Sequence, residues 1–72
     1  MKSNEIVKTI MKNDRLSQMA LAEKMGYNHQ SGVGNALQRE NKISVEMFLN
    51  MLNTMGYDLV VRRGKDEMVV TK

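Results

Sequence analysis

The sequence predicts a mostly α-helical domain of four helices that ends in a β-hairpin. From about residue 4 to residue 55, apolar side chains recur at helical spacings, and short polar segments interrupt them. Gly26 and Gly56 each follow such a stretch, at the position where a left-handed residue ends a helix. Beyond Gly56, two β-branched runs flank residues 63–66, which is a hairpin signal. We therefore expect a helical part over residues 1–56 and a hairpin over residues 57–72 of the same domain.

The first helix is expected to run from about Asn4 to Asn13, with Ser3 or Asn4 as its cap. Its apolar face consists of Ile6, Val7, Ile10 and Met11. This pattern is typical of a helix that packs against the rest of the core. Residues 13–15 are then expected to form a polar turn.

The second helix is expected to begin at Gln18, because the hydroxyl of Ser17 can accept a hydrogen bond from a free amide of the first turn. Leu16 can pack on Leu21 from just outside the helix. The helix should end at Met25, before Gly26. Its apolar positions are Met19, Ala20, Leu21, Ala22 and Met25.

The third helix is expected to follow a cap at Asn28 and to face inward with Val33, Ala36 and Leu37. The opposite face carries Ser31, Gly34, Asn35 and Gln38. Lys and Glu would be typical of a merely solvated face, whereas this one is small, polar and uncharged. Amides and hydroxyls of this kind are suited to base edges in a DNA major groove.

Gln18, the run Leu21–Gly26 and the segment Ser44–Gly56 resemble the phage-repressor class of helix-turn-helix proteins, which includes the lambda and 434 repressors and Cro. The resemblance covers roughly residues 4–56. It implies that Gln18 contacts a backbone phosphate, that the following helix lies in the major groove, and that the loop after that helix contacts phosphate again. One feature departs from the family: the spacing from Gly26 to Val33 is one residue longer than usual, so the turn at residues 27–30 carries an extra residue.

Two sets of residues are candidate DNA contacts. The residues expected to contact bases are Gln30, Ser31, Asn35 and Gln38. The residues expected to contact phosphates are Gln18, His29, Arg39, Asn41 and Lys42. For His29, simple solvent exposure is the alternative.

The fourth helix is expected to start after a cap at Ser44 and to run to Met55, with Ile43 packing on Phe48. Its apolar face is Phe48, Met51, Leu52 and Met55. We also expect methionines to fill the core rather than to form a pliable binding surface. The methionines expected in the core are Met19, Met25, Met51 and Met55.

The hairpin is expected to be apolar on both faces. Leu59, Val61, Met68 and Val70 should share one face, and Val60 and Val69 the other. One small helical body cannot cover both faces, so we expect a homodimer in which two hairpins form one sheet or pack face to face. The expected dimer interface is Leu59, Val60, Val61, Met68, Val69 and Val70. The basic tip, Arg62, Arg63 and Lys65, is interpreted as solvated, with a contact to flanking DNA as the alternative.

Composition narrows the function further. The 72 residues include no cysteine and one histidine, so we expect no disulfide, no metal, no cofactor and no enzymatic activity. No apolar run is long enough for a signal peptide or a membrane span, which favours a soluble cytoplasmic protein. The net charge of +3 favours a polyanionic partner.

We therefore expect a homodimeric repressor that binds double-stranded DNA at an inverted repeat. A ligand-sensing domain is absent from these residues, which favours repression by occupancy of a promoter. The main alternative is an antitoxin-like or accessory module whose hairpin binds a partner protein. An ordinary helical hairpin and a sequence-tolerant architectural DNA binder are further alternatives, although the latter predicts more Lys and Arg over residues 28–38, which contain none.

Overall fold

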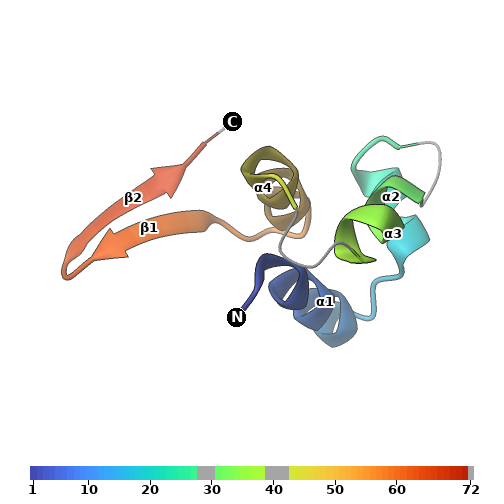
Figure 1. Cartoon of the computed structure of the whole chain (residues 1–72), viewed down its shortest axis with the longest axis horizontal. Coiled ribbons are helices and arrows are strands. Elements are labelled where there is room, and N and C mark those ends of the chain that lie inside the picture. The colour runs from blue at the N-terminus through green and yellow to red at the C-terminus, as the bar shows by residue number, and fades with distance from the viewer. Residues whose placement is uncertain (28–30, 39–42, 72) are drawn as a thin grey trace.

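The chain forms four helices followed by a two-stranded antiparallel hairpin, in a computed structural model that describes residues 1–27, 31–38 and 43–71 (Figure 1). Within those ranges the elements are α1 (Ser3–Asp14), α2 (Gln18–Lys24), α3 (Ser31–Gln38), α4 (Val45–Thr54), β1 (Leu59–Arg63) and β2 (Asp66–Val70). The expectation of a mostly helical chain with a C-terminal hairpin is confirmed.

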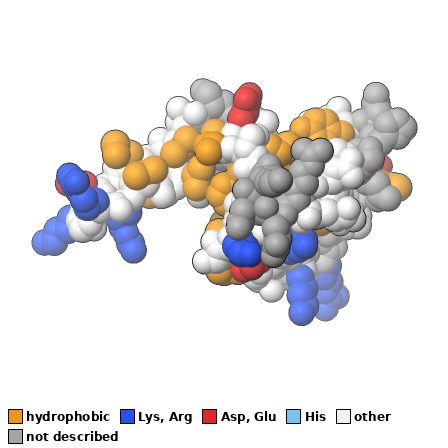
Figure 2. Space-filling model, in the orientation of Figure 1, with side chains coloured by type: hydrophobic (Ala, Val, Ile, Leu, Met, Phe, Trp, Pro, Cys, Tyr) orange, Lys and Arg blue, Asp and Glu red, His pale blue; other side chains and the backbone are white. Residues whose placement is uncertain are grey.

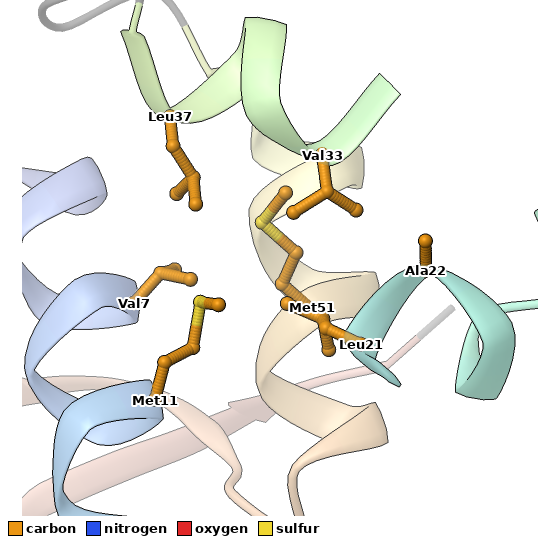
Figure 3. Packing of buried hydrophobic residues seen from close by; sticks show 7 residues of the cluster. All are labelled: Val7, Met11, Leu21, Ala22, Val33, Leu37 and Met51. Atoms are coloured by element: carbon orange, nitrogen blue, oxygen red, sulfur yellow. The ribbon is translucent and has the colours of Figure 1, made fainter. Parts of the chain in front are cut away.

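The core lies where the four helices meet (Figure 3). Its buried cluster is Val7, Met11, Leu21, Ala22, Val33, Leu37 and Met51. Each helix contributes to this cluster, so the inward stripes predicted for α1, α2 and α3 are confirmed in their main positions. In α4 the predicted stripe is also confirmed, with Met51 and Leu52 buried and Phe48 and Met55 half-buried against the core. The prediction missed Leu49, which is buried as well.

Serine caps begin two of the helices, as predicted. The backbone N–H of Ala20 donates to Ser17 Oγ at 3.0 Å, and that of Met47 donates to Ser44 Oγ at 3.1 Å. The predicted cap of α1 was wrong. The capping position is Lys2, which makes no side-chain capping hydrogen bond, and Ser3 already belongs to the helix.

Three helices end in the same way, with a residue in the left-handed region. That residue is Arg15 after α1, with φ 54°, Gly26 after α2, with φ 85°, and Gly56 after α4, with φ 86°. In each case the N–H of the next residue donates to the carbonyl five positions back, at 2.8 Å. This is the Schellman arrangement, which satisfies carbonyls that the helix leaves free. The polar turn expected at residues 13–15 is accordingly the end of α1, which extends to Asp14.

The expectation that Met19 fills the core was also wrong, since its side chain is 56% exposed. The other three predicted core methionines do contact the core. Met51 is fully buried, and Met25 and Met55 are half-buried against the cluster. Helix α2 has only seven residues, so its inward face is narrow and Leu21 with Ala22 fills it.

The hairpin extends away from the helices (Figure 1). Its register pairs Leu59 with Val70, Val60 with Val69, Val61 with Met68, Arg62 with Glu67 and Arg63 with Asp66. The predicted division of side chains between the two faces follows from this register and is confirmed. The two-residue turn has Gly64 at its first position with φ 61°, a conformation that glycine adopts without strain. Only Leu59 and Val70, at the base, are half-buried.

Candidate nucleic-acid interface

Helix α3 is packed on one side and exposed on the other. Val33 and Leu37 are fully buried in the core beside α1, α2 and α4 (Figure 3). On the opposite side Asn35 and Gln38 are exposed. None of the eight residues of α3 is charged. The helix is therefore held through its apolar stripe and presents uncharged amide side chains to the outside.

Gln18 lies directly against this exposed side of α3. A Cβ built on Gly34 would be 3.1 Å from Gln18 Oε1, which shows that the amide of Gln18 rests on the backbone of α3 where α3 has no side chain. Gln18 is the first residue of α2 and is itself exposed. The fold thus brings Gln18 next to the face that carries Asn35.

Tyr27 fixes the start of α3 from the α2 side. A Cβ on Gly32 would be 3.6 Å from two ring atoms of Tyr27, an ordinary contact distance, so the ring lies close to the first turn of α3. The hydroxyl of Tyr27 donates to Met47 Sδ at 3.2 Å. Tyr27 therefore links the end of α2 to both α3 and α4. Its place directly after the left-handed Gly26, where an apolar contact is common, was a usable sequence signal that the prediction missed.

Asn4 holds the opposite end of α3. Its side chain is only 5% exposed, and Nδ2 donates to the carbonyl of Leu37 at 3.4 Å. That carbonyl lies in the last turn of α3, where the helix provides no partner for it. Asn4 was predicted, as an alternative to Ser3, to cap α1. Its spacing of three and seven residues from Val7 and Met11 already placed it on the buried stripe of α1.

The structure brings some of the predicted DNA contacts together and leaves others untested. Gln18, Asn35 and Gln38 belong to the exposed surface of the α2–α3 pair, and Ser31 is the first residue of α3. The predicted contacts that lie outside the described residues are Gln30, His29, Arg39, Asn41 and Lys42. The predicted cap Asn28 lies outside them as well.

The hairpin is a second candidate surface. Val60, Val61, Met68 and Val69 are all exposed, with Met68 the most open at 67%. Figure 2 shows hydrophobic side chains along this arm and Lys and Arg side chains at its tip. All six predicted interface residues belong to the two strands, and the four away from the base are uncovered in the single chain.

The described part of the chain holds neither a cluster of metal-ligating side chains nor a helix that could span a membrane. In residues 1–27, 31–38 and 43–71 no three His, Cys, Asp or Glu side chains form a group that could hold a metal ion. No helix in the same ranges is long and apolar enough to cross a membrane. Comparisons of the chain with protein-family models, with curated proteins and with solved structures found no match.

Proposed function

We propose that the chain is a sequence-specific DNA-binding regulator whose α2 and α3 act as a helix-turn-helix, with α3 in the major groove. The observation that carries the proposal is the exposed, uncharged amide face of α3 beside Gln18. A solvated helix has no need for such a face, whereas Asn and Gln can make paired hydrogen bonds to adenine. The firm packing of the inner stripe supports it, because base contacts need a helix held in one position.

The roles within this interface follow from position. Asn35 and Gln38, with Gln30 and Ser31 nearer the start of α3, contact base edges. Gln18 holds a phosphate and sets the position of α3 without distinguishing sequences. The remaining phosphate contacts are proposed for His29, Arg39, Asn41 and Lys42.

We further propose that the protein acts as a homodimer and represses transcription. The exposed hairpin supports the dimer, because its apolar side chains and the open edge of β1 offer a surface on which a second chain can pair. A two-fold dimer presents one α3 to each half of an inverted repeat, with half-sites about 34 Å apart or a multiple of that distance. A dimer bound over a promoter excludes polymerase without any further chemistry, which is why we infer repression.

Fluorescence anisotropy of the purified protein tests this proposal. The protein is titrated against DNA from immediately upstream of its gene and against a shuffled duplex, at several salt concentrations. We expect binding to one duplex to be tighter by a factor of about 10³ or more at physiological salt. Equal and salt-sensitive binding to both duplexes would contradict sequence-specific autoregulation.

The exposed hairpin also favours one alternative function, a module that neutralises or recruits another protein. In that case Val60, Met68 and Val69 would be covered by a partner of different sequence. Analytical ultracentrifugation separates the two functions. A monomer at all accessible concentrations, together with no specific DNA binding, would favour the protein-binding module.

A further inference from the structure

The outer edge of β1 is open in the single chain. The sheet has the order β1–β2, so in the described residues β1 has a strand on one side only. Arg63 and Asp66 are paired across the two-residue turn, and the pair that flanks such a turn is a hydrogen-bonded pair. Bonding alternates along the strand, so Leu59 and Val61 direct their amides into the hairpin. Val60 and Arg62 direct theirs outward, where they can bond a further strand.

The residues along this edge form a self-complementary series. Asp58, Val60 and Arg62 lie two apart and share one face, and all three are exposed. The series has an acid at one end, an apolar residue in the middle and a base at the other end. We propose that β1 pairs antiparallel with β1 of a second copy of this chain, with the two-fold axis at Val60. This inference rests on the proposed function, in that it specifies how the proposed homodimer forms.

The pairing matches every side chain with a suitable opposite. Val60 faces its own copy, and Asp58 faces Arg62 of the second copy, on both sides of the axis. On the other face of the sheet, Leu59 lies opposite Val61. Tyr57 lies opposite Arg63, whose guanidinium can approach the ring of Tyr57. Because the interface is isologous, every contact away from the axis occurs twice.

Other registers lack this match. Moving the axis to Val61 places Arg62 opposite Val60 and Asp58 opposite Gly64. Moving it to Leu59 places Asp58 opposite Val60 and leaves Arg62 beyond the paired strand. An axis midway between two residues would shift the register by one residue. Amides that point outward on one strand would then lie opposite amides that point inward on the other, and paired side chains would lie on opposite faces of the sheet. Charge and hydrogen bonding together therefore select the register centred on Val60.

The β2 edge does not offer the same complementarity. If two copies of β2 paired about Val69, Glu67 would face Thr71, and if they paired about Met68, Asp66 would face Val70. Among residues 66–71, neither arrangement opposes a charge with its opposite. An exposed edge with matched charges is the one that favours a defined dimer over indiscriminate pairing.

The helical body leaves room for the second strand. An open groove lies at the base of β1, and Asp58 and Val60 line it. The helices contribute Ile6, Ile10, Phe48 and Leu52 to its walls. In the proposed pairing, the end of the second strand that carries Arg62 and Arg63 runs toward this groove, where Asp58 receives Arg62.

A charge exchange tests the register. Asp58→Arg places Arg opposite Arg62, and Arg62→Asp places Asp opposite Asp58, in each case twice per dimer. We expect either variant alone to raise the dimer dissociation constant by about tenfold or more, measured by sedimentation equilibrium at low salt. As a control for Arg62→Asp, Lys24→Asp makes the same charge change outside the paired edge and should leave the dissociation constant unchanged.

Mixing the two variants gives the decisive result. In a heterodimer of Asp58→Arg with Arg62→Asp, both facing pairs are again opposite in charge, so the mixture should dimerise more tightly than either variant alone. The double variant D58R/R62D should likewise recover homodimerisation. Arg62 also faces Glu67 within the hairpin, so R62D alone could act by weakening the hairpin. Recovery on mixing cannot arise in that way.

The outcomes separate this inference from the proposed function. A wild-type dimer that neither single variant weakens, or whose variants fail to recover on mixing, would overturn the register. A wild-type protein that stays monomeric would overturn the pairing itself. The anisotropy measurement decides independently whether the chain binds DNA specifically, since DNA binding can be measured whether or not the chains pair through β1.

Discussion

At the scale of single residues, the proposed function depends on the amide side chains that α3 exposes. Asn35 is exposed on the side opposite the buried Val33 and Leu37. If Asn35 makes paired hydrogen bonds to one base, Asn35→Ala should lower the preference for that base by about 1 to 3 kcal/mol. Competition anisotropy with duplexes that differ at single positions measures this preference.

Lys42→Ala is the matched control, because a phosphate contact carries no sequence information. It should weaken binding to all duplexes alike and reduce the salt slope by about one. If Asn35→Ala behaved in the same uniform way, the assignment of base contacts on α3 would be wrong.

Gly34 allows Gln18 to lie against α3. A substitution of Gly34 should therefore affect the free energy of unfolding and the affinity for DNA in different directions. Gly34→Ala removes a poor helix former and should raise the free energy of unfolding by up to about 1 kcal/mol. The new Cβ would lie 3.1 Å from Gln18 Oε1 and push this amide away. We therefore expect weaker DNA binding from a protein that is no less stable, measured by urea unfolding and anisotropy.

Gly32→Ala is the corresponding control in the same helix. Its Cβ would meet the Tyr27 ring at 3.6 Å, which is ordinary contact, so nothing has to move. Stability should rise while Gln18 keeps its place. Loss of binding in G32A but not in G34A would contradict the role given to Gln18.

At the scale of elements, the end of α1 offers a direct test of local strain. The same left-handed position is glycine after α2 and α4 but Arg15 after α1. A side chain costs about 1 kcal/mol in this conformation, so Arg15→Gly should stabilise the protein by about that amount or somewhat less. Arg15→Ala keeps the Cβ and should gain little. Equal effects of the two substitutions in urea unfolding would mean that the arginine side chain, rather than the conformation, is responsible.

Elements that local chemistry determines could be predicted from the sequence. Ser17 and Ser44 cap α2 and α4 because a hydroxyl there meets free amides within the same turn. The hairpin register follows from one two-residue turn. Asn4 was misassigned because two roles are open to its side chain. It can cap the start of α1, or it can bond the carbonyl of Leu37, which lies thirty-three positions away in the sequence. The position of Asn4 near the start of α1 favours the cap, whereas its spacing from Val7 and Met11 favours the buried contact.

The candidate site could also be predicted only in part. The exposed face of α3 is the side opposite its buried stripe, so helical periodicity alone was enough to predict it. The contacts of Gln18 with Gly34 and of Tyr27 with Met47 depend on how helices cross, which periodicity does not specify. Met19 was misplaced for the same reason, since only packing shows how narrow the inward face of a short helix is.

At the scale of the whole molecule, the two candidate surfaces lie at opposite ends of a body that measures 39 × 23 × 22 Å (Figure 1). The α2–α3 pair is at one end and the hairpin at the other. Pairing of two chains through their hairpins therefore leaves both α3 helices uncovered and related by the two-fold axis. This arrangement is what an inverted-repeat site requires, and it predicts two half-sites with a fixed spacing.

Selection of binding sites from a random duplex library tests whether the protein recognises an inverted repeat as a two-fold dimer. The wild-type protein is used at physiological salt, and bound duplexes are recovered and sequenced over several rounds. We expect an enriched inverted repeat whose half-site centres lie about 10 to 10.5 base pairs apart, or a multiple of this. Enrichment of no motif, or of a single half-site with no symmetric partner, would contradict a two-fold dimer that recognises sequence through α3.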